Sequence, residues 1–231
     1  MADWFRSPRE TSTPWLRAGS PWLLLVGELT LERTSTVVTR SLWPILATFT
    51  TPAELLEARA TVKELLTWID RVERLDTLLS VATRLQEAAS SRGTDTAYPT
   101  EDDLDALVAD RLVPRIAAEL AMMARPDGEE PILVTAGAIR VATRYRGNLL
   151  PRRNQNTAGR LAIASLVGYG PDAGSAHLAL FDIANDVCTV NRPTCHQCPL
   201  VSNCALGQGR ATAEPTSEPI RERLPHSTRS V

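Results

Sequence analysis

The 231-residue sequence predicts an all-α fold on two main observations. Helix-capping residues recur along the chain with apolar residues following at helical spacing, and strand signals are almost absent. The composition, 43% hydrophobic and 23% charged, is typical of a globular protein and excludes disordered, collagen-like and coiled-coil classes. No stretch approaches the ~20 apolar residues of a membrane helix, and the N-terminus lacks the pattern of a secretion signal. We therefore expect a cytoplasmic protein that does not bind membranes.

Local signals predict eight helices in order: 22–31, 51–69, 72–85, 104–108, one from 114, 136–146, 158–168 and 175–187. The first opens at Ser20, a good N-cap that is followed by Pro21 at the first helical position. The second opens with a capping box at 51–54, and apolar residues continue from there to Ile69. The third ends at the sequence SSRG, 90–93.

The later helices have similar signals. Thr100 with Asp103 caps the fourth, and Pro114 opens the fifth. The last three rest on apolar spacing, and the final one leads directly into four cysteines. Residues 207–231 are rich in Pro, Ser, Thr, Glu and Arg, so we expect a disordered tail that offers a possible site for a protein partner.

Charge is unevenly distributed along the chain. Residues 101–131 carry nine acids and three arginines, whereas 132–212 carry eight arginines and three aspartates. The basic segment permits contact with a polyanion, although a solvated arginine-rich surface is the commoner explanation of such a run. The candidate DNA-binding arginines are Arg115, Arg140, Arg144, Arg152 and Arg153.

The four cysteines, Cys188, Cys195, Cys198 and Cys204, have the spacing C-x6-C-x2-C-x5-C. Thiolates packed this closely suit an iron–sulfur cluster or zinc, and disulfides are disfavoured in a cytosolic chain. Zinc sites more often pair two C-x2-C units across a longer separation, so the spacing moderately favours a cluster.

Several motifs resemble one family. Pro193 precedes the second cysteine and Pro199 follows the third, as in the 4Fe-4S loop of the MutY and endonuclease III glycosylases of the helix-hairpin-helix superfamily. The segment PWLLLVGELTLERT, 21–34, is similar to the MutY helix that carries a catalytic glutamate, and 14–15 (Pro-Trp) matches the extended segment before it. The resemblance covers nearly the whole chain before the tail.

The resemblance implies a fold of two helical lobes around a cleft. One is a six-helix-barrel-like lobe, 21–134, and the other is an iron–sulfur cluster lobe built from 1–20 and 135–206. It also implies a 4Fe-4S cofactor on the four cysteines and a partner that is double-stranded DNA with a damaged or mismatched base. We expect a monomer associated with the nucleoid.

The sequence departs from the family at two places. The family aspartate is missing, and its position holds Thr135. The family hairpin has the form LPGVG, whereas 107–116 reads LVADRLVPRI and contains no glycine. We also expect no counterpart of the MutY domain that recognises 8-oxoguanine, since only a short tail follows the cysteines. The single lysine, Lys63, lies far in sequence from the candidate site, so the Schiff-base chemistry of a lyase is not expected.

Glu28 is the candidate catalytic acid by this resemblance. On a largely apolar helix its carboxyl would have a raised pKa and could protonate a leaving base. The alternative places Glu28 on an exposed stripe with Glu32, four residues later. Thr135 has the alternative interpretation of a helix N-cap, which would keep the cap and lose the charge.

Two function hypotheses follow. The first is a monofunctional DNA N-glycosylase that acts on a flipped base through Glu28. The second is a catalytically inactive homologue that binds DNA or a protein partner. A redox-sensing cluster protein that does not bind DNA is a third and weaker alternative. A second carboxylate near Glu28 would favour the enzyme, and apolar filling would favour the binding module.

Overall fold

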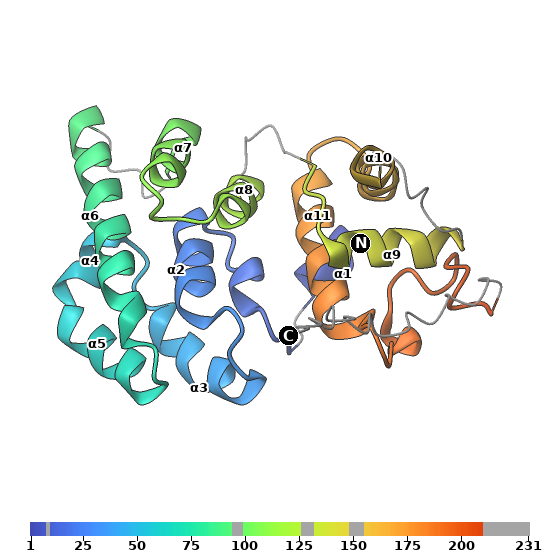
Figure 1. Ribbon diagram of the computed structural model, residues 1–231, viewed down its shortest axis with the longest axis horizontal. Helices are drawn as coiled ribbons and strands as arrows, with labels where there is room; N and C mark the ends of the chain where they lie inside the picture. Colours follow the sequence, from blue (N-terminus) through green and yellow to red (C-terminus); the bar gives the residue numbers. More distant parts are fainter. Residues whose placement is uncertain (8–9, 94–98, 126–131, 148–154, 210–231) are drawn as a thin grey trace, which may run out of the picture.

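The computed structural model describes residues 1–7, 10–93, 99–125, 132–147 and 155–209. Within these ranges it contains helices and no strand, which confirms the all-α prediction (Figure 1). The elements are α1 (Ala2–Arg6), η1 (Pro14–Arg17), α2 (Pro21–Leu31), α3 (Thr36–Leu46), α4 (Pro52–Glu57), α5 (Arg59–Trp68), η2 (Val72–Arg74), α6 (Leu75–Arg92), α7 (Glu101–Ala109), α8 (Arg115–Met123), α9 (Ala136–Arg146), α10 (Gln155–Val167), α11 (Ala173–Asp182), a π-helical segment (Ile183–Val187) and η4 (Cys195–Gln197).

The predicted helix starts are confirmed where a capping side chain sets them. Ser20 accepts a hydrogen bond from the Leu23 amide at 3.3 Å and begins α2. At α4 and α7 the capping boxes close in both directions, through Thr51 and Thr100 respectively. A side-chain cap satisfies an amide that has no partner within the helix, so the start is fixed locally.

The structure differs from the predicted helices at two places in the first group. The single helix expected over 51–69 is two short helices, because the backbone turns at Ala58 (φ −87°, ψ 17°). The turn lets both α4 and α5 pack against α6, with Leu55 and Leu66 fully buried. The helix α3 was not expected, since its β-branched start (Thr36-Val37-Val38) does not show a helical pattern.

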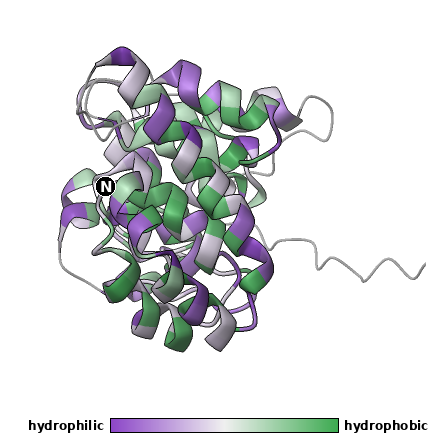
Figure 2. Cartoon of the chain, turned by 90° about the vertical axis from the view of Figure 1, so that its left-hand side faces the viewer, coloured by the Kyte–Doolittle hydropathy of each residue, from purple (hydrophilic) through white to green (hydrophobic). Residues whose placement is uncertain are grey.

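The helices form two groups that lie side by side in Figure 1, α2–α8 in one and α1 with α9–α11 in the other. The larger hydrophobic core fills the first group around α2, and it also takes in Leu178 and Phe181 of α11. A smaller core joins α9, α10, α11 and the π-helical segment. Single helices in Figure 2 carry both apolar and hydrophilic residues, as amphipathic helices do. The predicted division into lobes at residue 134 stays a prediction.

The N-terminal segment is attached to α11 by buried polar contacts. Arg17 donates to the carboxylate of Asp182, which has no exposed surface, and Thr11 donates to the same carboxylate. The backbone amide of Ser12 donates to Asp186 at 2.9 Å. The guanidinium of Arg17 also lies 4.9 Å from the ring centroid of Phe5. These contacts fix residues 11–17, the segment that carries Trp15, relative to α11 and the π-helical segment.

None of the helices in the described ranges has the length and apolar character needed to cross a membrane.

Candidate active site and cysteine loop

A cavity of about 530 Å³ opens beside the C-terminal half of α2. Its walls come from α2, η2, the start of α6 and the turn between α7 and α8, and its lining residues are Glu28, Leu29, Glu32, Glu73, Arg74, Thr77, Val108, Arg111, Leu112, Val113, Pro114 and Arg115. All of them belong to 21–134. This cavity therefore lies within the first group of helices, beside the α7–α8 turn, and the placement of the site in a cleft between two lobes stays a prediction.

Glu28 is held by a short hydrogen bond from a neighbouring aromatic side chain. The indole Nε1–H of Trp15 donates to Glu28 Oε1 at 2.6 Å. Burial raises the pKa of the Glu28 carboxyl, the Trp15 hydrogen bond lowers it by a smaller amount, and the charge of Glu32 raises it further. The structure therefore gives Glu28 the raised pKa expected of a proton donor.

Glu32 lies one helical turn after Glu28 and lines the same cavity. Its side chain is 48% exposed and lies 3.3 Å from the guanidinium of Arg33. Glu28 shares a helix face with Glu32, as the exposed-stripe interpretation predicted. That face lines a cavity, as the catalytic interpretation requires. Glu32 thus adds a second carboxylate to the cavity of Glu28, which favours the enzyme hypothesis. An apolar lining would have favoured the binding module.

Arg74 closes the end of the helix that carries both carboxylates. Its Nη1 donates to the carbonyls of Leu29 and Thr30 at 3.3 Å and to that of Glu32 at 3.4 Å. The final carbonyls of a helix have no partner within it, so these bonds stabilise the C-terminus of α2. Burial lowers the pKa of Arg74. No local pattern in the sequence predicts this contact, because 45 residues separate the donor from Leu29.

The turn between α7 and α8 replaces the glycine hairpin of the family pattern. Arg111 takes the left-handed conformation (φ 59°) that a glycine normally supplies. The amides of Leu112 and Val113 both donate to the carbonyl of Leu107, which closes the turn. Arg111 and Arg115 are exposed at the mouth of the cavity, and Arg115 lies 3.8 Å from Asp105. The predicted DNA contact of Arg115 stays a prediction.

Thr135 begins α9 as an N-cap. Its Oγ1 accepts a hydrogen bond from the Ala138 amide at 3.1 Å, which confirms the capping interpretation. Thr135 is not among the residues that line the cavity of Glu28. Among the residues that the structure describes, Glu28 and Thr135 therefore do not share this cavity. Three acids that precede Thr135 in the sequence, Asp127, Glu129 and Glu130, lie outside the described residues.

Two arginines that were predicted to contact DNA, Arg140 and Arg144, hydrogen-bond to the cysteine loop and the segment before it. Arg140 Nε donates to the carbonyl of Cys188, and its Nη2 to that of Ala184, both at 2.8 Å. Arg144 is 7% exposed and donates to the carbonyls of Thr189 (2.6 Å) and Val190 (2.9 Å). These bonds engage both guanidinium groups within the chain, and their DNA contact stays untested. Arg152 and Arg153 lie outside the described residues.

The four cysteines are free thiols of intermediate exposure. Burial raises the pKa of the Cys198 thiol, a backbone hydrogen bond at Leu200 lowers it by a smaller amount, and the charges of the other three cysteines raise it further. Arg144 Nη1 lies 3.6 Å from the sulfur of Cys188. In the part of the chain that the structure describes, no set of three or more His, Cys, Asp and Glu side chains is arranged to hold a metal ion.

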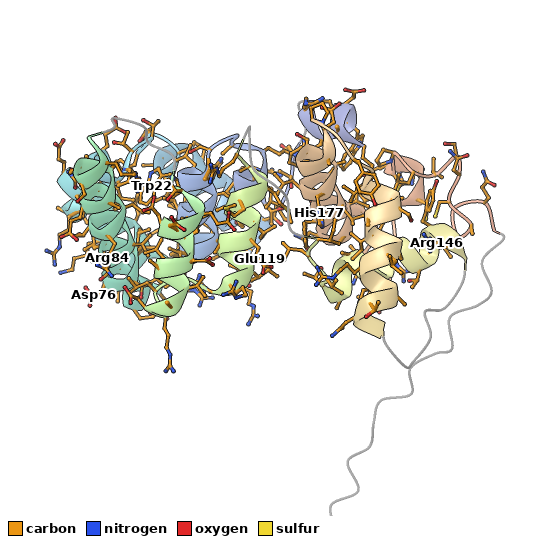
Figure 3. All side chains as sticks on the ribbon, turned by 90° about the horizontal axis from the view of Figure 1, so that it is seen from above. Trp22, Asp76, Arg84, Glu119, Arg146 and His177 are labelled. Atoms are coloured by element: carbon orange, nitrogen blue, oxygen red, sulfur yellow. The ribbon has the colours of Figure 1, made fainter. Side chains whose placement is uncertain are left out.

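His177 is a buried polar side chain that the sequence did not single out. It has no exposed surface, and its ring stacks on Phe181 with centroids 5.5 Å apart. Neither ring nitrogen has a partner at hydrogen-bond geometry among the described residues, although the backbone of Leu133 is close enough to favour the charged form. Burial outweighs that contact and lowers the pKa of His177 to about 4. In Figure 3 His177 lies on the side of α11 that faces α2–α8.

Comparisons with known proteins identify similar glycosylases. The chain is 29% identical to a thymine/uracil-DNA glycosylase from Pyrobaculum aerophilum, over 91% of both chains. It is 26% identical to a thymine-DNA glycosylase from Aeropyrum pernix, over 88% of this chain and 91% of the relative. A solved structure of a thermostable thymine-DNA glycosylase has the same fold, with a TM-score of 0.62 at 17% identity over 90% of this chain and 93% of that one. No family model matches the sequence.

Proposed function

We propose that this protein is a monofunctional DNA glycosylase that removes thymine or uracil from DNA by hydrolysis. The observation that carries the proposal is the cavity whose lining contains the partly buried Glu28 and a second acidic side chain, Glu32. The names of the two similar proteins support a pyrimidine as the base, in place of the adenine that a MutY resemblance would suggest.

The reaction breaks the N-glycosidic bond and joins a water oxygen to C1′ of the sugar. The bonding electrons leave with N1 of the pyrimidine, and the resulting negative charge spreads onto its O2 oxygen. A neutral Glu28 carboxyl would donate its proton there, which makes the base a better leaving group. Because burial raises the pKa of Glu28, the neutral form persists at a higher pH than for a solvated glutamate.

The sugar becomes a cation-like centre as the base departs, and a carboxylate stabilises it. Glu32 offers that charge from the same wall of the cavity as Glu28. Water loses one proton overall when it attacks C1′, and that proton passes to a carboxylate or to solvent. The cavity contains no lysine, and Lys63 is exposed on α5, so no amine is placed to attack the sugar as a lyase would.

DNA would reach this cavity past the α7–α8 turn, where Arg111 and Arg115 are exposed. Each arginine that neutralises a phosphate releases a counterion, so affinity would fall with salt. Extrusion of the target nucleotide from the duplex would bring its base to Glu28.

The cysteine loop, 188–204, would hold a 4Fe-4S cluster, as in the helix-hairpin-helix glycosylases that the sequence resembles. Its donors are four soft thiolates, and Arg140 and Arg144 place positive charge beside the loop. A four-iron cluster binds each thiolate to a different iron, so its ligands lie further apart than around one ion. When bound, the cluster would fold the loop and add no redox step to hydrolysis. Iron and zinc content of natively purified protein tests this assignment.

A second candidate function is an inactive homologue that binds DNA or a protein. The specific observation in its favour is Thr135, a neutral N-cap that lies outside the cavity lining.

One assay separates the two candidates. Purified protein would be incubated with duplexes that carry T or U opposite G, A opposite 8-oxoguanine, or an alkylated base, and abasic sites would be cleaved with alkali. We expect product from the T or U duplexes, and Glu28→Gln should reduce the rate by ~10²- to 10⁴-fold. Glu57→Gln, an exposed glutamate on α4, is the matched control. DNA binding without product from any duplex would instead establish the binding module.

A further inference from the structure

The side chains of Trp15 and Glu28 join the short helix η1 to α2. Trp15 lies on the short helix η1 and is 2% exposed, and its indole N–H donates to Glu28 Oε1 at 2.6 Å. A buried indole that places its single donor on a carboxyl oxygen satisfies both groups, since each would otherwise lack a partner. The ring of Trp43 lies 6.1 Å away at 60°, which restricts the indole from another side.

Gly27 makes this contact possible. A Cβ at residue 27 would lie 2.2 Å from Cγ and 2.3 Å from Cβ of Trp15, closer than real side chains approach. The indole therefore lies directly on the backbone of α2, next to the residue that carries the carboxyl. A glycine inside a helix costs ~1 kcal/mol relative to alanine. Gly27 therefore lowers the intrinsic stability of α2, but its lack of a side chain lets Trp15 pack on the helix backbone.

The direction of the hydrogen bond assigns the proton of neutral Glu28. An indole N–H can only donate, so Oε1 must accept. In a carboxylic acid the carbonyl oxygen is the better acceptor, and the proton therefore belongs on Oε2. Oε1 is occupied by Trp15, which leaves Oε2 as the oxygen able to deliver a proton to a ligand in the cavity.

We propose that Trp15, seated on Gly27, is the positioning residue that fixes the Glu28 carboxyl with Oε2 as its proton-donating oxygen. The inference rests on the proposed function for its catalytic meaning, since the donated proton goes to the leaving pyrimidine. It goes beyond that function by giving the N-terminal segment a defined task at the site.

The pKa of Glu28 provides a readout that a purely structural role would not move. The charged groups that share its cavity are Glu32, Glu73, Arg74, Arg111 and Arg115. The N–H donor stabilises the carboxylate, so its loss raises the pKa of Glu28. A glycosylase that needs neutral Glu28 loses activity as the pH rises through this pKa, and a higher pKa moves that decline to higher pH.

The experiment compares Trp15→Phe with Trp22→Phe. Phenylalanine keeps an aromatic ring and removes the N–H. Trp22 is the matched control, because it is fully buried on α2 and its indole donates to the Phe49 carbonyl at 2.9 Å. The carboxyl pKa of Glu28 would be followed by NMR on ¹³C-glutamate-labelled full-length protein, with Glu28→Gln used to assign the signal. The pH dependence of kcat would be measured on the most active duplex.

In Trp15→Phe we expect a higher pKa of Glu28, a decline of kcat displaced to higher pH, and a kcat lower by ~10- to 100-fold at the plateau. Trp22→Phe should leave the pKa and the profile in place. Gly27→Ala should reproduce the Trp15→Phe effects while Trp15 itself is intact.

A Glu28 pKa that is unchanged in folded Trp15→Phe would overturn the proposal, as would an equal displacement in Trp22→Phe. Because the NMR titration needs no turnover, it decides the role of Trp15 even if the wild-type protein releases no base. A wild-type protein that releases no base would count against the proposed function and would leave the role of Trp15 to the titration.

Discussion

Arg17 and Asp182 form an ion pair in which the carboxylate has no exposed surface and the guanidinium side chain is 13% exposed. Arg17 Nε donates to Asp182 Oδ2 at 3.1 Å, and a second donor, Nη2, reaches the same oxygen. The pair joins the segment before α2 to α11, two residues after the indole that contacts Glu28. It therefore couples the position of Trp15 to the second group of helices.

Replacing Arg17 should strongly destabilise the fold. Arg17→Ala leaves the charge of Asp182 buried without its main partner, and breaking a buried pair in this way costs ~3–5 kcal/mol. Urea unfolding at pH 7 measures the loss. Arg40→Ala is the control, because Arg40 pairs with Glu10 at the surface, and an exposed pair contributes less than ~1 kcal/mol. Equal losses in the two variants would contradict this account.

Stability should fall as the pH is lowered from 7 to 5, through His177. Burial lowers its pKa to about 4 in the folded chain, against 6.5 for the unfolded chain. Below pH 6.5 the unfolded chain binds a proton that the folded chain excludes, so the unfolding free energy decreases by about 2 kcal/mol by pH 5 and levels off below pH 4.

The variant that checks this is His177→Phe, measured by urea unfolding at several pH values. It should lose this part of the pH dependence, whereas His196→Gln, at an exposed position, should keep it. If the unfolding free energy of His177→Phe still falls between pH 7 and pH 5 as steeply as that of the wild-type protein, other groups cause the pH dependence.

Glu32→Gln should move the pH profile in the opposite direction from Trp15→Phe. The charge of Glu32 raises the pKa of Glu28, so its removal lowers that pKa. Loss of kcat with rising pH should then begin at lower pH, and kcat itself should fall at least tenfold, because the sugar cation loses its carboxylate. Glu57→Gln is again the control. A profile that does not move would show that the two carboxyls do not interact.

Arg144→Ala should weaken retention of iron by the cysteine loop. The variant removes donors to two loop carbonyls and to the sulfur of Cys188, and outer contacts of this kind change metal affinity by ~10- to 100-fold. Iron per chain after dialysis against a chelator measures the effect. Arg146→Ala is the control, since Arg146 donates a hydrogen bond to Ser165 on the neighbouring helix α10. Equal iron retention in both variants would count against the role of Arg144.

Features set by neighbouring residues could be predicted from the sequence. The caps at Ser20, Thr51, Thr100 and Thr135 each use a side chain and an amide three residues later, so the pattern is visible in the sequence. The helix α3 also has a side-chain cap, Ser35, but its β-branched first turn obscured it.

Features that depend on tertiary packing could not be predicted in this way. Glu28 was identified through a motif, whereas its partner Trp15 and the capping donor Arg74 come from other elements. The arginine run at 140–146 could not show which guanidinium groups point into the protein. Arg140 and Arg144 lie one helical turn apart and both reach the cysteine loop, which a count of charges does not reveal.

The attachment of residues 11–17 to α11 also has a consequence for synthesis of the chain. The partners of these contacts lie 165 to 174 residues later, so a nascent chain cannot complete them until most of the protein has left the ribosome. Until then the segment that carries Trp15 lacks its attachment to α11. Assembly of the Glu28 site should therefore be among the last events of folding, after the local helices have formed.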